Sequence, residues 1–439
     1  MYLRHLHVRN VKLLRDVEID FCGADGRPRM WTVFVGENRL CKTTLLQTIA
    51  AAAAGVDRGT QLVTDVVASW PDLRNPVPLS VDATFGFSER RHGLRSYPTY
   101  PASSLQDSPP TLHSKLELQP DKRVFTGSSG YVGEPPGPDP LTETRSLGIP
   151  DWFVAGYGPS RLLPSSGMTR RQVDPSTDRL RSLFGEPLIG TGFIEILGEE
   201  LGRAFAKVLQ SVLVDGGLLP HVTALELRGR HGIRSSRDLV EAQRFEMDLL
   251  DADGKRIRVP AIWLSQGYQT LIAWLADLVG QILLESGGPV EAADMEGIVL
   301  VDELDLHLHP TWQLRLIPAL KQVFPRLQFI ATTHSAMVLP ALSADEVIML
   351  SPDEQGSVIA TPSSRSPALL TATELLDAFF EIQRLHPGEL GAKTRRYGLL
   401  ATDPTRTAEE HAQMIALRRE LEVAGLEFDW EPVPREDVP

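Results

Sequence analysis

Cysteine is nearly absent from this chain, and two marks of exported or membrane proteins are missing. The 439 residues contain two cysteines, Cys22 and Cys41, which excludes a disulfide framework and fits a reducing compartment. No apolar run approaches the ~20 residues needed to cross a bilayer, and the N-terminus lacks the apolar core of a signal peptide. We therefore expect a cytoplasmic protein without a membrane partner.

An excess of positive charge is also missing. The formal net charge of −13 argues against a protein whose whole surface grips nucleic acid, although it permits a local basic patch. One short stretch, called here the basic run, contains Arg228, Arg230, His231, Arg234 and Arg237. Without interleaved aromatic residues it is more typical of a solvated loop than of a nucleic-acid site. A more diluted cluster contains Arg161, Arg170, Arg171, Arg179 and Arg181. DNA therefore stays a candidate partner.

Hydrophobic patterning is present and indicates the fold class. Residues 31–35, 297–301 and 327–332 are nearly all apolar, as expected for strands buried on both faces. Helical spacing at 42–54 and 268–285 alternates with these strands, which predicts an α/β fold with a mainly parallel sheet. The sequence further predicts strands at 79–87 and 152–156, a helix at 193–214, a hairpin at 245–260, and helices at 372–384 and 407–424. Residues 90–150 are rich in Pro, Ser and Gly and are expected to be an irregular insertion.

A candidate phosphate-binding loop lies between the strand at 31–35 and the helix at 42–54. Its residues are Gly36, Glu37, Asn38, Cys41, Lys42, Thr43 and Thr44. Such a loop needs inward backbone N–H groups at a helix N-terminus, a lysine for the β and γ phosphates and a hydroxyl for Mg²⁺. Lys42 and Thr43 supply the last two. The alternative is an ordinary strand-to-helix turn.

Two residues of this loop depart from the usual pattern of glycines. Cys41 replaces the second glycine of G-x-x-x-x-G-K-[ST], and Arg39 stands where many such loops carry another. Both side chains constrain a backbone that glycine leaves free, which predicts reduced nucleotide affinity. Cys41 at a helix N-terminus beside Lys42 has the setting of a reactive thiol, but a small residue tolerated in the loop is favoured.

The other two buried strands end in residues suited to nucleotide hydrolysis. Asp302 and Glu303 follow the strand at 297–301, and His334 follows the strand at 327–332. In doubly wound folds ligands bind at this carboxyl edge of the sheet. Asp302 would hold Mg²⁺ through water, Glu303 could polarise the attacking water, and His334 would contact the γ-phosphate. Three strands ending in suitable residues predict a site that binds ATP and Mg²⁺.

A helix start at residues 264–268 resembles the signature motif of ABC ATPases. Ser265 is a candidate N-cap whose hydroxyl and nearby free N–H groups are exposed, and Gly267 follows it. By itself this is only a capped helix. In ABC ATPases the serine and glycine bind the γ-phosphate held by the opposite subunit. The resemblance therefore implies a homodimer, or a higher even oligomer, in which two copies meet head to tail.

Residues 1–50 and 255–340 together resemble the SMC, RecF and OLD-nuclease branch of ABC ATPases. Asp302-Glu-Leu-Asp-Leu-His-Leu-His-Pro310 is similar to a stretch in OLD-like and Septu-type anti-phage defence ATPases, and Tyr157-Gly-Pro-Ser-Arg161 more loosely resembles a strand-end motif of the group. Lys12 stands where the branch has a basic residue that approaches phosphate, although lysine defines that contact less well than arginine. His309 replaces the D-loop aspartate of transporter-type relatives. We could not place a glutamine lid loop.

The resemblance implies an ABC-type P-loop ATPase head with a mixed, mainly parallel core sheet, an inserted lobe and a C-terminal helical extension. We expect the N-terminal part of the head at 1–89, the irregular insertion at 90–150, a return strand and lobe at 151–260, the C-terminal part of the head at 261–365 and the extension at 366–439. The implied function is ATP hydrolysis that controls a separate effector nuclease in anti-phage defence.

Two other interpretations stay open at this point. His307 and His309 beside the carboxylates have the composition of a metal-hydrolase site, but that interpretation leaves Lys42 and Ser265 unexplained. The chain could instead be a nucleotide-gated DNA-repair clamp or scaffold that hydrolyses little ATP. Glu303 favours hydrolysis, whereas Arg39 and Cys41 leave the scaffold open.

Overall fold

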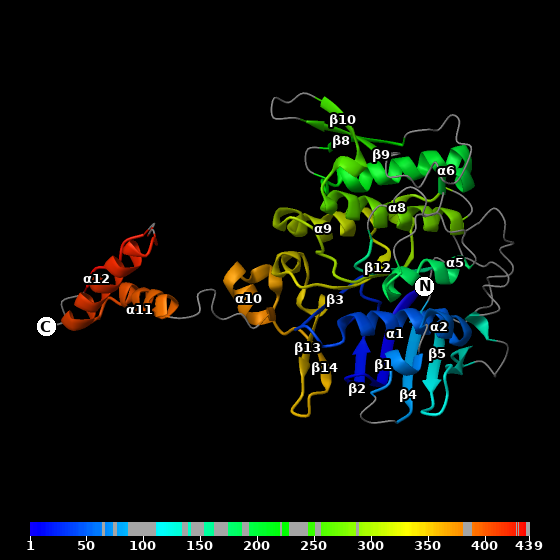
Figure 1. Ribbon diagram of the computed structural model, residues 1–439, viewed down its shortest axis with the longest axis horizontal. Helices are drawn as coiled ribbons and strands as arrows, with labels where there is room; N and C mark the ends of the chain where they lie inside the picture. Colours follow the sequence, from blue (N-terminus) through cyan, green and yellow to red (C-terminus); the bar gives the residue numbers. More distant parts are fainter. Residues whose placement is uncertain are drawn as a thin grey trace. The chain divides into compact units, whose positions relative to one another are not determined.

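The computed structural model forms two compact units, residues 1–375 and 376–439, which are described separately (Figure 1). The residues that the structure describes are 1–63, 66–72, 77–86, 111–133, 139–141, 153–161, 174–186, 193–219, 222–227, 245–250, 256–286, 289–380, 389–426, 428 and 430–435.

A six-stranded sheet forms the centre of the first unit. In spatial order its strands are β14 (Val358–Pro362), β13 (Val347–Pro352), β3 (Trp31–Val35), β12 (Leu327–Thr332), β11 (Gly297–Val301) and β7 (Val154–Tyr157). All neighbours are parallel except β13 and β14. Every residue of β3, β11 and β12 is buried, because both faces of the sheet are covered. The expected mixed, mainly parallel core sheet is confirmed.

A second, antiparallel sheet uses the N-terminal part of the chain. Its strands are β2 (Leu14–Asp20), β1 (Tyr2–Val11), β4 (Leu79–Gly86), β5 (Thr111–Leu118) and β6 (Thr126–Tyr131). Alternate residues of β4 are buried, as expected for a sheet with one covered face. Strands β5 and β6 lie inside 90–150, so the expectation of an irregular segment is wrong there. Pairing of β5 with β4 and of β6 with β5 selects these strands, and composition alone does not reveal a pairing partner.

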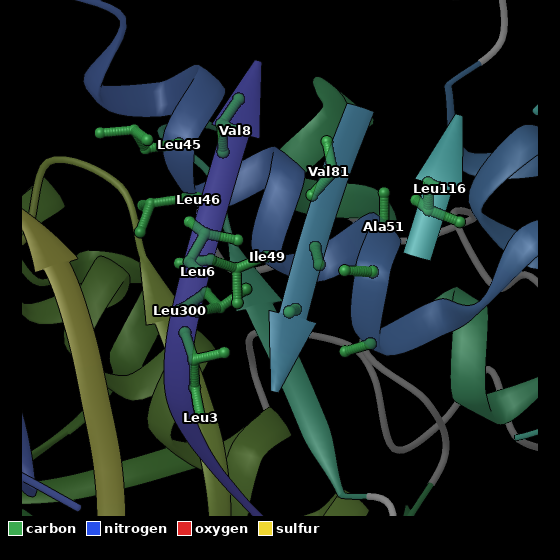
Figure 2. Close-up of a cluster of buried hydrophobic side chains, with 14 of the residues drawn as sticks. Leu3, Leu6, Val8, Leu45, Leu46, Ile49, Ala51, Val81, Leu116 and Leu300 are labelled. Atoms are coloured by element: carbon green, nitrogen blue, oxygen red, sulfur yellow. The ribbon is translucent and has the colours of Figure 1, made fainter. Parts of the chain in front are cut away.

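Helix α1 (Lys42–Ala54) packs against strands of both sheets. Leu45, Leu46, Ile49 and Ala51 meet side chains of β1, β4, β5 and β11 in a continuous core, as Figure 2 shows. Small alanine side chains fill the last turns, which allows the sheets to approach the helix closely. The helix ends at Gly55, whose φ of 81° is left-handed and favours glycine. This packing fixes the start of α1, and with it the loop after β3.

Helix α8 (Gln266–Ser286) packs beside α6 (Phe193–Gln210). Both helices lie near a small antiparallel sheet (Figure 1). Its strands are β8 (Val222–Leu227), β9 (Phe245–Leu250) and β10 (Arg256–Pro260). The expected hairpin, β9 with β10, is confirmed. Contrary to the expectation of no spanning run, α8 is long and apolar enough to cross a membrane by composition. However, 83% of its window is buried inside the protein, so its packing accounts for its apolar character. Helix α9 (Pro310–Val323) follows β11.

The remaining elements are short connectors or belong to the C-terminal part. The connectors include α2 (Val56–Leu62), α3 (Val66–Ser69), α5 (Pro175–Asp178), η4 (Arg181–Phe184), η5 (Ser211–Asp215), η7 (Ala261–Trp263), η8 (Ala292–Asp294), η9 (Ala336–Ala341), η10 (Ala344–Glu346) and η11 (Pro367–Leu369). Helix α10 (Ala372–Phe380) spans the boundary between the two units.

Two helices, α11 (Glu389–Thr402) and α12 (Ala408–Val423), form the second unit. Side chains such as Tyr397 and Leu421 pack into a small core. Thr407 and Glu410 make a reciprocal capping box at the start of α12. Helix α11 was not expected, since its glycines and mixed polar composition weaken the helical pattern.

Candidate functional site

The loop after β3 closes around the amino group of Lys42. Lys42 Nζ donates hydrogen bonds to the carbonyl oxygens of Gly36 at 2.7 Å and Glu37 at 2.9 Å. Burial lowers the pKa of Lys42, and the charges of Asp302, Glu303 and Glu37 oppose that shift. The lysine therefore lies inside the loop, facing backbone oxygens and within the field of the nearby carboxylates.

Left-handed backbone at Arg39 and Cys41 explains why glycine is usual at these positions. Arg39 has a φ of 84° and Cys41 a φ of 57°, and this conformation costs about 1–2 kcal/mol for a residue that has a Cβ. Gly36 is required for a different reason, because a Cβ there would lie 2.6 Å from the carbonyl oxygen of Leu350. The chain therefore keeps the loop geometry while accepting strain at two positions.

Thr43 and Asp302, 259 residues apart in sequence, meet directly at the edge of the central sheet. Thr43 Oγ1 donates to Asp302 Oδ2 at 2.7 Å, and Thr332 Oγ1 donates to Asp302 Oδ1 at 2.6 Å. A hydroxyl and a carboxylate are the hard oxygen ligands that Mg²⁺ prefers. The two predicted metal-site residues thus lie together, and their chemistry fits a magnesium ion.

Glu303 begins the turn after β11 in a left-handed conformation, with a φ of 49°. Its N–H donates to Thr332 Oγ1 at 2.8 Å, and its carbonyl oxygen accepts from Leu306 N–H at 3.0 Å and from Arg161. Because backbone contacts hold this residue, the carboxylate is left half-exposed. A side chain in this position is available to a water molecule.

His334 lies at the end of β12 on a turn that Asp305 organises. Asp305 Oδ1 accepts from Thr333 Oγ1 at 2.5 Å and from His334 N–H at 3.2 Å. The His334 side chain is exposed. Asp305 thus joins the end of β12 to the turn after β11, which brings the regions of His334 and Glu303 to one edge.

Lys12 reaches the start of α1 from the turn between β1 and β2. Its Nζ donates to Thr44 Oγ1 at 3.1 Å, and its own φ of 51° is left-handed. Thr44 follows Thr43 directly, so the ammonium group lies beside the phosphate loop. The structure therefore brings Lys12 to the region predicted for it.

Ser265 and Gly267 lie at the start of α8. Ser265 is exposed, and its carbonyl oxygen accepts the N–H of Gln269 at 3.1 Å. Gly267 packs so closely on the turn after β11 that a Cβ would lie 2.5 Å from the carbonyl oxygen of His307. Within the described residues no hydrogen bond joins either residue to the loop at 36–44. Among the described residues, Ser265 and Gly267 at the start of α8 are thus not joined by hydrogen bonds to the loop that carries Thr43.

The diluted basic cluster is not supported by the structure. Arg161 is buried against backbone carbonyls, Arg179 pairs with Glu285, and Arg181 pairs with acidic residues of its own segment. These arginines thus have internal partners, which sequence position does not reveal. Arg170 and Arg171 lie outside the described residues, as do all members of the basic run.

His309 is the N-cap of α9. Its Nδ1 lies 2.9 Å from Thr311 Oγ1 and accepts from Thr311 N–H at 3.4 Å. Among the described residues, no group of three or more His, Cys, Asp or Glu side chains is arranged to hold a metal ion. The described part of the structure therefore gives the metal-hydrolase interpretation of His307 and His309 no support. The thiol of Cys41 lies 3.9 Å from the carbonyl oxygen of Arg39.

Several polar residues that connect the site were missed in the sequence. Thr332 links Asp302 to Glu303. Gln313 donates to the carbonyl oxygens of Asp305 and Leu308 and accepts from Ser335 Oγ at 2.6 Å. The available signal in the sequence was that Thr332 is a polar residue at the end of a mostly apolar strand.

A family model described as "AAA domain, putative AbiEii toxin, Type IV TA system" matches residues 32–339. The Septu protein PtuA from Bacillus mycoides (strain KBAB4) is 25% identical over 424 residues, covering 96% of this chain and 50% of PtuA. The retron Ec83 probable ATPase from Escherichia coli is 34% identical over 148 residues, covering 34% of this chain and 26% of that protein. The chain therefore spans at most about half the length of these relatives.

A solved structure of the SMC head bound to the C-winged helix domain of ScpA superposes with a TM-score of 0.48 at 15% identity, covering 84% of this chain and 99% of that one. The family match covers well over half of the chain, including the phosphate loop, the carboxylate pair and His334. The protein belongs to this AAA-domain family, and it is similar to the Septu protein PtuA and to a retron probable ATPase.

Proposed function

We propose that the protein binds and hydrolyses ATP, and the observation that carries the proposal is the contact between Thr43 and Asp302. Thr43 lies in the first turn of α1 and Asp302 follows β11, and their oxygens are 2.7 Å apart. The loop at 36–44 offers a buried lysine and a helix N-terminus to phosphate oxygens. The match to the AAA family and the likeness to a retron probable ATPase support the same activity.

In this proposal Thr43 and Asp302 hold Mg²⁺, Asp302 through a water molecule. When bound, the ion would neutralise charge on the phosphate oxygens. Lys42, now bonded to the carbonyl oxygens of Gly36 and Glu37, would turn to the β and γ phosphates. Lys12, anchored on Thr44, would add a second cation. Two loop residues, the exposed Asn38 and the half-buried Cys41, would border the phosphates.

Glu303 is proposed to accept a proton from the attacking water, and His334 to contact the γ-phosphate and that water. The half-exposed carboxylate and the exposed imidazole follow adjacent strands, β11 and β12. A positioned carboxylate general base contributes typically ~100-fold or more to such a step. Among the described residues, no hydrogen bond of the Glu303 or His334 side chain would hold it away from a nucleotide.

We further propose that two copies assemble head to tail, so that Ser265 and Gly267 of one copy meet the nucleotide of the other. The exposure of Ser265 and the lack of hydrogen bonds between the start of α8 and the chain's own loop, within the described residues, support this arrangement. Nucleotide-driven association would then control a separate effector nuclease in anti-phage defence, in keeping with the similarity to Septu PtuA. The rival proposal is a DNA-repair clamp or scaffold that hydrolyses little ATP, and strain at Arg39 and Cys41 favours it.

The steady-state ATPase rate, measured with and without DNA, tests this proposal, with Glu303→Gln as the matched variant. Glutamine preserves the shape of the side chain, and the hydrogen bonds that hold residue 303 come from its backbone. We expect retained ATP binding and a hydrolysis rate at least ~100-fold lower. Equal turnover by wild type and variant would show that Glu303 is not the base, whereas nucleotide binding with negligible wild-type turnover would favour the scaffold.

A further inference from the structure

Arg161 is a buried arginine whose guanidinium ends on backbone oxygens. It is 1% exposed. Its Nη1 donates to the carbonyl oxygens of Gly158, at 2.9 Å, and Asp302, and its Nη2 donates to the carbonyl oxygen of Glu303. No carboxylate oxygen among the described residues forms an ion pair with it, and its Nε is buried without a partner. The backbone carbonyl oxygens of Asp302 and Glu303 are thus its main hydrogen-bond acceptors.

Burial of this charge is unfavourable, which makes its location informative. Desolvation lowers the pKa of Arg161 to about 10, against the raising effect of Asp302, Glu303 and Asp305. An arginine serving only to fill the core would ordinarily be paired with a carboxylate. Here the guanidinium is directed at the peptide units that fix Glu303.

The segment that carries Arg161 is itself held firmly. The carbonyl oxygen of Tyr157 accepts the N–H of Asp302 at 2.8 Å, and Gly158 N–H donates to Ser182 Oγ at 3.2 Å. A Cβ on Gly158 would lie 2.2 Å from the carbonyl oxygen of Ser182, so only glycine fits. The origin of the Arg161 side chain is therefore fixed relative to the end of β11.

We propose that Arg161 is a positioning residue that sets the direction of the Glu303 carboxylate for hydrolysis. It donates to the carbonyl oxygens of Asp302 and Glu303, which belong to the two peptide units that flank the Cα of Glu303, while Thr332 Oγ1 accepts the N–H of Glu303. Together these contacts hold residue 303 in the left-handed conformation that its φ of 49° records. Without Arg161 the turn relaxes toward ordinary backbone angles, and the carboxylate rotates away. The inference rests on the proposed ATPase function.

Arg161→Met and Arg161→Lys test this role, with Arg179→Met as the matched control. Arg179 is also buried, at 5% exposure, but its guanidinium bonds the carbonyl oxygen of Val154, at the opposite end of β7, and the carboxylate of Glu285. We expect Arg161→Met to lower kcat about 10- to 100-fold, as small misplacements of reacting groups do. The KM and the Kd for ATP should change by less than about twofold, because the hydrogen bonds of Arg161 among the described residues go to the carbonyl oxygens of Gly158, Asp302 and Glu303 and not to the loop at 36–44. Arg161→Lys should retain more of the wild-type kcat than Arg161→Met. The control Arg179→Met should lower the stability of the protein but leave kcat per nucleotide-binding site unchanged.

A double-mutant cycle with Glu303→Gln separates positioning from general damage. If Arg161 acts through Glu303, Arg161→Met in the Glu303→Gln background should cause no further loss, because the group that it positions is already disabled. Losses that multiply, or an Arg161→Met variant with wild-type kcat, would overturn the inference while leaving the ATPase proposal intact. A wild-type protein that binds ATP without hydrolysing it would overturn both.

Discussion

The substitution Asp277→Asn should make the stability of the folded protein less sensitive to rising pH. Asp277 lies inside α8 at 3% exposure. Its Oδ2 accepts from the hydroxyl of Tyr157 at 3.0 Å, and its Oδ1 accepts from Gln281 Nε2 at 3.5 Å. Asparagine has the same shape and, with the Gln281 amide turned over, makes both contacts. The substitution therefore removes an ionisable group without opening a cavity.

The magnitude follows from the environment of this carboxyl. Burial raises the pKa of Asp277 from 3.8 to about 7, although the bonds from Tyr157 and Gln281 and the charge of Arg179 lower it. Because the folded pKa lies above the unfolded one, stability present below the unfolded pKa is lost as pH rises through about 7. The full loss is about 4 kcal/mol at 1.36 kcal/mol per pKa unit, and roughly 2–3 kcal/mol of it falls between about pH 5 and about pH 8.

Urea unfolding of wild type and Asp277→Asn at about pH 5 and about pH 8 measures this effect. Other titrating groups are common to both proteins and cancel in the difference. We expect the stability of the variant relative to wild type to increase by roughly 2–3 kcal/mol between the two pH values. Parallel pH dependence of the two proteins would refute the idea that Asp277 is forced to ionise in an apolar site.

Three further predictions concern the nucleotide site and its partners. Lys42→Ala should abolish ATP binding, because a loop strained at two positions depends on its lysine. If a titration with a fluorescent ATP analogue gave an affinity within about twofold of wild type, this loop would be excluded as the phosphate site. Ser265→Arg should prevent ATP-driven association but not binding by the monomer, and full dimerisation of this variant in the Glu303→Gln background by size measurement would contradict the composite site. Changing the four arginines of the basic run to glutamate should weaken DNA binding and flatten its salt dependence in anisotropy titrations, with basal ATPase activity retained. Unchanged affinity and slope would identify the run as a solvated loop.

The amino-acid sequence by itself determined the class of fold and the order of its chemical elements. Strands β3, β11 and β12 are mostly apolar and fully buried because both faces are covered, and such runs stand out without a structure. Since parallel strands present their carboxyl ends at one edge, Thr43, Asp302 and His334 could be assigned to one region before their contacts were known. Helical spacing at 42–54 and 407–424 likewise predicted α1 (Lys42–Ala54) and α12 (Ala408–Val423).

Only the tertiary structure decided which polar groups meet and which strands pair. Arg161 belonged to a diluted basic cluster in the sequence, yet it is buried against carbonyl oxygens of residues more than 140 positions away. Strands β5 and β6 form through pairing with β4 and with each other, because cross-strand contacts outweigh the weak preferences of their own residues. The need for glycine at position 267 depends on the approach of His307 from another segment. Periodicity records which face of an element is covered, whereas the partner that covers it is set by long-range packing.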